Sequence, residues 1–308
     1  MCSVPCKTER DDTVSIIVPV YNDSESLIKC IESLLEQDIS NEYEIIVVDN
    51  GSHNFNTYSA EINKKYPSVI LLQELSPGSY AARNKGLSIA KGKVIAFTDS
   101  DCIAHKSWLS TAIKRLQKVD MVGGRIEVFY KDPQNPTSVE LYESVFAFDQ
   151  KSAVARGHSV TANLLVKKIV IDKVGVFNSK TFSGGDIEFT DRANKAGFKI
   201  DYSEDAMVYH PARRKYSEYQ NKLRRVIGGQ FVLKHENDIF MNNFTLKALI
   251  KDLLAPFKFL FISNFIMKID DCDLLKRLRI FNVVLHNRYY SFYCKVKMLI
   301  LGGKNLTR

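Results

Sequence analysis

The sequence predicts an α/β fold with a mostly parallel sheet flanked by helices, followed by a basic, mainly helical C-terminal region. Short runs rich in Val and Ile alternate with segments of helical spacing at roughly 25-residue intervals, the pattern of a doubly wound sheet. These runs are apolar throughout, and strands of that kind are buried on both faces of a parallel sheet. From Tyr216 onward, long apolar and basic helical patterns replace the alternation.

The first hundred residues are expected to hold four strands separated by three helices. Each strand is a continuous apolar run, and each helix has apolar residues three or four positions apart. The expected strands are 14–20, 43–50, 68–74 and 93–100, and the expected helices are 24–37, 58–66 and 79–91.

Beyond residue 100 the pattern is less regular. The stretch 184–200 reads as a Gly-rich loop that opens a helix, and Gly197 ends this helix because glycine readily takes the left-handed conformation found there. The other elements expected here are a helix beginning near Lys106, strands at 121–130 and 161–168, a short helix at 169–174 and a short strand ending at His210.

The net charge of +8 is unevenly distributed along the 308 residues. Residues 1–211 carry 24 Lys and Arg against 28 Asp and Glu, whereas residues 212–308 carry 19 against 7, a balance of +12. Clustered basic residues suit nucleic acid, an anionic membrane or a polyanionic glycan. We expect no nucleic-acid partner, because binding to nucleic acid would explain the basic residues of this region but not its apolar runs.

Three parts are expected: an N-terminal tail (1–12), a catalytic domain (13–211) and the basic C-terminal region (212–308). The apolar stretch 248–267 contains Lys251, Asp252 and Lys258 and is interrupted by Pro256, so an interfacial helix pair suits it better than a membrane span. A helix packed on the catalytic domain fits this stretch equally well.

The six cysteines form no CxxC pair, and no apolar signal segment precedes the first strand. We therefore expect a protein of the reducing cytoplasm, located either free in it or peripherally on the cytoplasmic face of the membrane. The sequence leaves the oligomeric state open, a dimer included.

Two aspartates, Asp99 and Asp101, follow the fourth strand in the stretch VIAFTDSDC, residues 94–102. Ligands of open parallel sheets bind beyond the carboxyl ends of the strands. Two carboxylates one residue apart there can share Mn²⁺ or Mg²⁺, with phosphate and water oxygens completing the shell. Taken alone, one aspartate would serve equally well as the cap of the next helix.

Three more loops at the same edge of the sheet carry residues suited to a nucleotide. Tyr21 can cover the face of a base, Asp49 can accept a base N–H, and Arg83 can offer its guanidinium to a phosphate. Because the ends of parallel strands converge, we expect these side chains, together with Pro19, to line one cleft.

Four blocks of the sequence, in order, resemble family 2 glycosyltransferases with the GT-A fold. The blocks are VSIIVPVYNDSESLIKCIESLL, EIIVVDNGS, ARNKGLSIAKGKVIAFTDSD and GGDIEFTDRANKAGFKI with VYH, and they span residues 13 to about 211. The resemblance implies a Rossmann-like GT-A sheet and an inverting, metal-dependent transfer of a sugar from a nucleotide-sugar, most often a UDP-sugar. The acceptor would be a hydroxyl of a glycan or of a lipid-linked saccharide in polysaccharide or cell-envelope assembly.

The resemblance also implies roles in donor binding. Pro19, Tyr21 and Asp49 would hold the uracil or other base. Asp99 would contact the ribose or the metal, and Asp101 would hold Mn²⁺ or Mg²⁺ against the diphosphate. The charge that develops on the leaving diphosphate requires cations, the metal and Arg83 among them.

Asp186 is the general base that the resemblance implies, since the acceptor hydroxyl must lose a proton as it attacks. The family commonly has an acidic residue where this chain has Gly185, and this departure removes one acceptor- or sugar-binding carboxylate. Glu188, two residues after Asp186, is the second acidic residue of the motif.

Five further residues take their expected roles from the resemblance, and two of them also have a plainer reading. His210 would complete the metal shell or contact the diphosphate, as a neutral imidazole can. Trp108 either floors the sugar or acceptor site or packs on the sheet, and Arg192 either binds acceptor phosphate or pairs with Glu188 at i,i+4. Arg156 and Asn163 would line the donor sugar.

Two other functions compete with sugar transfer. A nucleotidyltransferase also uses a parallel sheet, a metal and a nucleotide, but VPVYNDSES lacks the basic Gly-rich loop that it needs after the first strand. A non-catalytic nucleotide or nucleic-acid binder would use the basic tail and would leave Asp99, Asp101 and Asp186 without a role.

Overall fold

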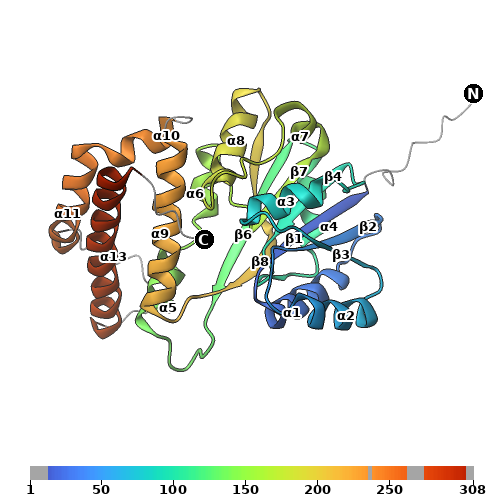
Figure 1. The fold of residues 1–308 in the computed structure, drawn as a ribbon, viewed down its shortest axis with the longest axis horizontal. Coiled ribbons are helices and arrows are strands. Elements are labelled where there is room, and N and C mark those ends of the chain that lie inside the picture. Colours follow the sequence, from blue (N-terminus) through green and yellow to red (C-terminus); the bar gives the residue numbers. More distant parts are fainter. Residues whose placement is uncertain (1–12, 235–237, 262–273, 303–308) are drawn as a thin grey trace, which may run out of the picture.

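The computed structural model of the chain describes residues 13–234, 238–261 and 274–302. Residues 1–12, the expected N-terminal tail, lie outside the described residues, and so does the end of the apolar stretch 248–267. Figure 1 shows a sheet covered by helices, with a group of C-terminal helices standing beside it.

The sheet has eight strands in the order β3-β2-β1-β4-β7-β6-β8-β5. Four of them, β3, β2, β1 and β4, are parallel neighbours. They coincide with the four strands expected in the first hundred residues. The strands are β1 (Val14–Val20), β2 (Tyr43–Asp49), β3 (Val69–Gln73), β4 (Val94–Thr98), β5 (Ile103–Ala104), β6 (Met121–Phe129), β7 (Asn163–Lys167) and β8 (Ile200–Pro211).

The second half of the sheet is mixed. β7 runs antiparallel to both β4 and β6, while β6 and β8 are parallel with a register shift between Gly124 and Arg125. β8 extends from Ile200, so the short strand expected to end at His210 is the end of a much longer one. Most of the pairs remain parallel, which confirms the predicted fold class.

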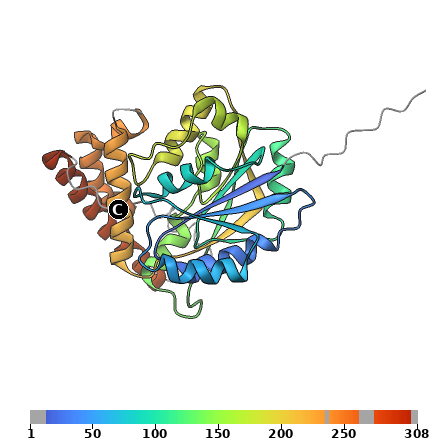
Figure 2. The ribbon, with the colours of Figure 1, turned by 45° about the vertical axis from the view of Figure 1, so that its right-hand side comes forward.

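The helices lie on both faces of the sheet and beside it (Figures 1 and 2). They are α1 (Ser24–Leu35), α2 (Phe55–Lys65), α3 (Ser79–Leu87), α4 (Trp108–Leu116), α5 (Ser138–Phe146), α6 (Gln150–Ala155), α7 (Lys168–Val174), α8 (Gly185–Lys195), α9 (Tyr216–Leu233), α10 (Asp238–Met241), α11 (Leu246–Phe261) and α13 (Leu274–Leu301), with a 3₁₀ turn at Asn242–Phe244. The sequence analysis missed α5 and α6. A capping box, in which Thr137 and Glu140 exchange hydrogen bonds, begins α5 and was the available signal.

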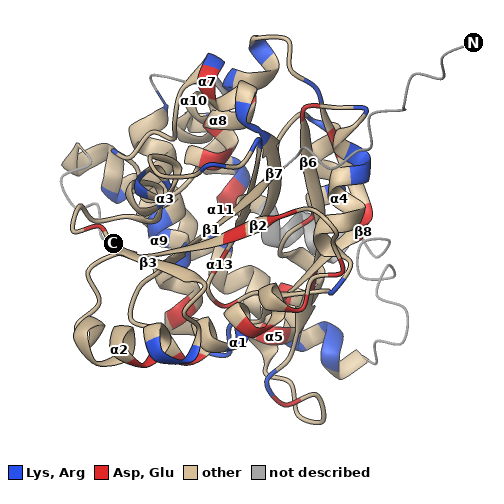
Figure 3. Ribbon diagram, turned by 90° about the vertical axis from the view of Figure 1, so that its right-hand side faces the viewer, with Lys and Arg blue, Asp and Glu red and all other residues tan. Residues whose placement is uncertain are grey.

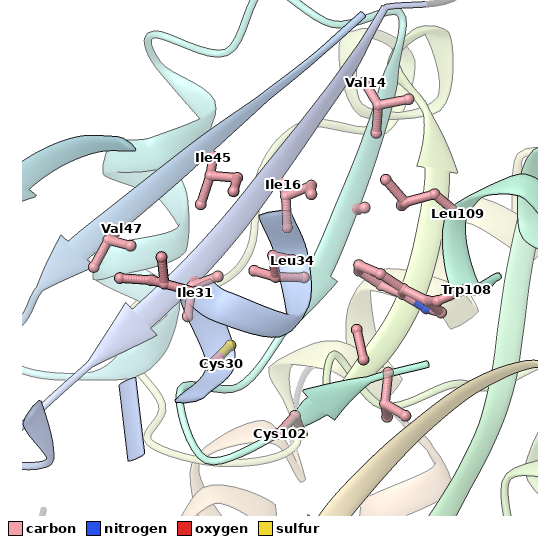
Figure 4. Packing of buried hydrophobic residues seen from close by; sticks show 14 of the residues in the cluster. Val14, Ile16, Cys30, Ile31, Leu34, Ile45, Val47, Cys102, Trp108 and Leu109 are labelled. Atoms are coloured by element: carbon pink, nitrogen blue, oxygen red, sulfur yellow. The ribbon is translucent and has the colours of Figure 1, made fainter. Parts of the chain in front are cut away.

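Two apolar layers hold the sheet between its helices. On one face, Ile31 and Leu34 of α1 and Trp108 of α4 pack near Ile16 of β1 (Figure 4). On the other face, Tyr80 of α3 and Phe189 of α8 lie among the residues packed on β1, β2 and β4. Because helices cover both faces of the sheet, ligands have access at the ends of the strands.

The C-terminal helices form a separate layer that starts soon after β8. α9 packs on α13, and α13 packs on both α5 and α11, so α13 lies between α9 and α11 (Figure 1). The change from sheet to helices falls between Pro211 and Tyr216, close to the expected boundary at 211. Within the described ranges, none of the helices combines the length and the apolarity needed to cross a bilayer.

Candidate active site

A cavity of about 440 Å³ opens at the carboxyl ends of β1 and β4, where the sequence predicts a ligand site. Side chains from β1, α3, the β4–β5 turn, α8, β8 and α9 line it. Seven of the residues singled out from the sequence meet there: Pro19, Tyr21, Arg83, Asp99, Asp101, Asp186 and His210.

A second hollow, of about 400 Å³, adjoins this cavity. Pro19, Tyr21, Ser79, Phe182 and Arg225 line both. Tyr21 is 40% exposed, so part of its surface is accessible to a flat group. A larger hollow of about 510 Å³ borders the first residue of β4, at the end of that strand away from the aspartates, and carries none of the predicted site residues.

Asp101 and His210 form a pair suited to a cation. The Nδ1 atom of His210 lies 2.8 Å from the carbonyl oxygen of Pro211, which can only accept, so Nδ1 carries the proton. In the neutral ring the Nε2 lone pair then faces the Asp101 carboxylate, with 3.6 Å between Nε2 and Oδ2. Two such acceptors repel each other unless they share a cation or a proton, and the pair therefore fits a divalent metal ion.

Two neighbouring residues, Cys102 and Asp99, are weaker candidates for metal ligands than Asp101 and His210. Cys102 lies within reach of the same point, and burial raises the pKa of its thiol well above the usual value, which disfavours the thiolate in the metal-free protein. The carboxylate of Asp99 forms an ion pair with the guanidinium of Arg83. One Asp99 oxygen is thus engaged by a buried cation, and Asp101 with His210 is the better candidate pair for binding a divalent cation.

Asp186 is held by three hydrogen bonds at the start of α8. Its Oδ1 accepts from the Tyr80 hydroxyl and from the Ile187 backbone N–H, both at 3.0 Å, and its Oδ2 accepts from the Thr161 N–H at 3.4 Å. Burial raises the pKa of Asp186 above its usual value, although the bond from Tyr80 opposes this. A carboxylate with a raised pKa and a fixed direction is suited to proton transfer.

Gly185 allows the Tyr80 ring to reach Asp186. A Cβ atom at position 185 would lie 2.9 to 3.0 Å from carbons of that ring. The missing side chain at position 185 therefore leaves room for the Tyr80 ring, whose hydroxyl bonds to the carboxylate of Asp186.

The sequence matches the model of glycosyl transferase family 2 over residues 15–174. The chain belongs to glycosyltransferase family 2. It is 37% identical to glycosyltransferase AglE of Haloferax volcanii, over 70% of this chain and 72% of AglE. It is 23% identical to the amylovoran biosynthesis glycosyltransferase AmsB of Erwinia amylovora, over 69% of this chain and 74% of AmsB.

A solved mannosyltransferase shares the fold of this glycosyltransferase. It is the mannosyltransferase PcManGT from Pyrobaculum calidifontis, in complex with GDP-Man and Mn²⁺, with a TM-score of 0.64, 16% sequence identity, and coverage of 97% of this chain and 89% of that one. At this identity the likeness shows the fold alone. The predicted family, the GT-A fold and glycosyltransferase activity are confirmed, and the comparisons give no support to the two competing functions.

The C-terminal region of this glycosyltransferase contributes cations that the sequence analysis missed. Arg213, just before α9, and Lys222 and Arg225 on α9 all line the main cavity, and Arg225 also lines the adjoining hollow. The Lys222 ammonium lies 5.3 Å from the centroid of the Phe148 ring. The cavity is therefore shared between the expected catalytic domain and the expected C-terminal region.

Glu143 of α5, whose acidic residues are red in Figure 3, holds two of these cations. This buried carboxylate accepts from the Arg213 backbone N–H at 2.8 Å, from Arg213 Nη1 at 2.9 Å and from Lys222 Nζ at 3.0 Å. Burial, and then the nearby Arg213, lower the pKa of Lys222 to about 8. In the described part of the chain, no ion pair joins Arg225 to a carboxylate.

Asp49 does not lie where a base can reach it, which corrects the expectation that it accepts a base N–H. It is fully buried. Its Oδ1 accepts from the N–H groups of Gly51 and Ser52, each at 3.0 Å, and its Oδ2 accepts from the Tyr58 hydroxyl. Burial would raise the pKa of Asp49, but these hydrogen bonds outweigh it and lower the pKa. Asp49 therefore shapes the loop after β2.

Trp108 and Asn163 are core residues, so Trp108 takes the second of its two expected roles, packing on the sheet, and the expected contact of Asn163 with the donor sugar is corrected. Both are completely buried, and neither lines the cavity. The Trp108 indole N–H donates to Asn163 Oδ1 at 2.8 Å, while Asn163 Nδ2 donates to the carbonyl oxygens of Arg125 and Ala206. This cluster holds β7 against the irregular part of β6 and β8.

Three more residues expected to contact substrate, Arg156, Glu188 and Arg192, are not among those that line the cavity. Arg192 pairs with Glu188, with 2.7 Å between Nε and Oε1, and its Nη2 donates to the carbonyl oxygen of Val176 at 3.0 Å. Arg192 thus ties α8 to the end of α7, the plainer of its two readings. Arg156 is an exposed residue at the end of α6 and is not among the cavity residues.

Proposed function

We propose that this enzyme transfers a sugar, with inversion, from a nucleotide-diphosphate sugar to a hydroxyl of a glycan or lipid-linked acceptor. One observation carries the proposal. A cation-binding pair, Asp101 with His210, and a fixed carboxylate of raised pKa, Asp186, line the same cavity at the carboxyl ends of the strands. An inverting transfer needs these two groups, one for the leaving diphosphate and one for the attacking hydroxyl.

The donor nucleotide occupies the hollow between Tyr21 and Arg225 in this proposal. The Tyr21 ring covers the base, and the diphosphate extends from there into the main cavity, where Arg213, Lys222 and Arg225 offer cationic side chains. The sequence motifs favour a uracil nucleotide, whereas PcManGT was solved with GDP-Man. Both nucleotides therefore belong in the test.

A divalent cation, Mn²⁺ or Mg²⁺, would be held by Asp101 and His210, with Asp99 beside them. Bound there, it supplies Lewis-acid stabilisation of the negative charge on the departing diphosphate. The protein supplies the rest of that stabilisation through Lys222 and Arg225. Arg83 holds Asp99 in place and so keeps the first of the two aspartates oriented.

Asp186 accepts the proton of the acceptor hydroxyl as that oxygen attacks the anomeric carbon. Tyr80 and the Thr161 N–H fix the direction of its two oxygens. The raised pKa brings the strength of this base closer to that required at neutral pH. Protonation inactivates it, so the rate falls as the pH falls through the pKa of Asp186.

A lipid-linked acceptor would place the enzyme peripherally on the cytoplasmic face of a membrane. The balance of +12 in residues 212–308 supports this part of the proposal, because anionic lipid headgroups attract clustered Lys and Arg.

The experiment is a screen of nucleotide-sugars, GDP-mannose and UDP-hexoses among them, for hydrolysis and transfer by the full chain with Mn²⁺. We expect one nucleotide class to be turned over and its nucleoside diphosphate to be released. Failure to bind any nucleoside diphosphate in the presence of Mn²⁺ would contradict the proposal.

A further inference from the structure

α11 carries a row of apolar side chains on its exposed side. Among residues 246–254, the part of α11 whose side chains are described, Leu246, Ile250, Leu253 and Leu254 have exposed fractions of 73%, 47%, 42% and 46%. Their spacing of four, then seven, then eight positions from the first places them on one face of the helix. We call these four residues the α11 stripe. In a helix packed only within its own chain, such a stripe is the buried face.

The opposite side of α11 carries the buried charge. Asp252 is 4% exposed and pairs with two cations of α13, Lys295 Nζ at 2.6 Å and Arg288 Nη1 at 3.1 Å. Since a buried carboxylate without its partners is costly, these ion pairs fix the rotation of α11 on α13. The α11 stripe therefore faces outward because Asp252, on the opposite side of the helix, is held by its ion pairs with α13.

The surroundings of the stripe are basic and apolar. Lys247 and Lys251 are exposed next to the stripe, one turn apart on the same helix. α13, on which α11 packs, exposes further large apolar side chains: Leu274, Leu275, Leu278, Tyr289, Tyr293, Leu299, Ile300 and Leu301. Figures 1 and 2 place both helices on the side of α9 away from the sheet.

We propose that the α11 stripe docks on an anionic lipid surface, with Lys247 and Lys251 reaching the headgroups. This inference rests on the proposed transfer to a lipid-linked acceptor and names the surface that meets the membrane. Apolar side chains flanked by lysines are the pattern of a helix lying in the headgroup layer, where leucines enter the acyl boundary and ammonium groups stay in water. Two copies of a region with a balance of +12 repel each other, so charge favours lipid over a second copy.

The test is co-sedimentation of the full chain with vesicles of phosphatidylcholine and of phosphatidylcholine mixed with phosphatidylglycerol. We expect binding to the mixed vesicles at low salt and its loss at high salt. The double variant Ile250→Ala with Leu254→Ala should lower the partition coefficient about tenfold or more, because apolar surface is lost from the interface. The double variant Lys247→Gln with Lys251→Gln should weaken binding only to the anionic vesicles.

Leu75→Ala is the matched control, since Leu75 is 74% exposed and lies in the loop after β3, outside the C-terminal helices. It should bind vesicles like the wild type. All variants change exposed side chains, and circular dichroism together with affinity for UDP or GDP in the presence of Mn²⁺ should be unchanged. If the protein binds nucleotide but stays in the supernatant with anionic vesicles at low salt, the docking surface alone is overturned. If it sediments with the vesicles but binds no nucleotide, the transferase proposal alone is overturned. Sedimentation velocity can also contradict the lipid-docking proposal. It would do so if the wild type is a dimer and the Ile250→Ala, Leu254→Ala variant is a monomer that binds vesicles as the wild type does.

Discussion

Tyr80 and Asp186 exchange two hydrogen bonds across more than a hundred residues of sequence. The Tyr80 hydroxyl donates to Asp186 Oδ1 at 3.0 Å and accepts from the Asp186 backbone N–H at 3.2 Å. Tyr80 comes from α3 and Asp186 from the start of α8, so this contact sets the position of the proposed base relative to the sheet.

Tyr80→Phe should therefore slow transfer while leaving donor binding intact. We expect kcat to fall by about tenfold to a hundredfold, since Asp186 loses one of the bonds that orient it. The bond from Tyr80 lowers the pKa of Asp186, so its removal should move the acid limb of the pH–rate profile to higher pH. A fall in kcat without a shift of that limb would mean that Tyr80 acts only through packing.

The cations of α9 should strengthen donor binding. Lys222→Gln and Arg225→Gln are each expected to weaken binding of the nucleoside diphosphate about tenfold, because each removes a charge-assisted contact with phosphate. Arg224→Gln, which changes the same helix outside the cavity, is the control. Calorimetry measures all three, and equal affinities would show that α9 lines the cavity without contacting the donor.

Lys222 should also give this binding a pH dependence. Its pKa of about 8 means that the ammonium is partly neutral in the free enzyme at mildly alkaline pH. An anionic ligand favours the charged form, so binding should take up a proton, and affinity should fall as the pH rises above about 8. The charged and titratable groups near Lys222 are Glu143, Arg213, Arg225 and Tyr219. Lys222→Gln should remove this slope.

The part of the site that was predicted correctly is the part that the strand pattern determines. Continuous apolar runs predict β1 and β4. Because the carboxyl ends of parallel strands converge, Tyr21, Asp99 and Asp101 are expected in one cavity, and all three line it. The pattern carries no information on how buried a loop carboxylate is. Asp49 follows β2 as Asp99 follows β4, yet its oxygens are used by its own loop.

The remaining residues depend on contacts between distant segments. Trp108 and Asn163 meet across α4 and β7, and only the packing of those elements shows that they satisfy each other. Lys222 and Arg225 lie three positions apart in a basic region, and the sequence analysis related the charge of this region to an anionic membrane or a polyanionic glycan. Their place in the cavity depends on how α9 packs near Glu143, and no local sequence pattern predicts that packing.

Asn163→Ala should destabilise the fold rather than weaken substrate binding. The Trp108 N–H and the carbonyl oxygens of Arg125 and Ala206 would lose their partner in a buried site, at a cost of about 2–4 kcal/mol in the free energy of unfolding. Urea denaturation measures this, with the exposed Asn63→Ala in α2 as a control expected within about 0.5 kcal/mol of the wild type. Normal stability together with a raised KM for the donor would restore the contact with sugar expected from the sequence.

Metal removal should weaken donor binding through Asp101 and His210. Calorimetry of UDP or GDP should show clearly higher affinity with Mn²⁺ than with EDTA, because the diphosphate would otherwise meet uncompensated carboxylates. Asp101→Asn and His210→Gln should each reduce the gain from Mn²⁺, whereas His286→Gln on α13 should keep it. The same affinity in EDTA as in Mn²⁺ would argue against the metal site.

Asp186→Asn tests the central claim most directly, because the substitution removes the base with little change in shape. Transfer should fall by about two to four orders of magnitude, the usual contribution of a positioned general base, while the affinity for the nucleotide stays within a few fold of the wild type. Glu188→Gln, two residues further along α8, should keep most of its rate because Glu188 pairs with Arg192 outside the cavity. An Asp186→Asn enzyme that retains most of its transfer rate would contradict the claim that this carboxylate is the base.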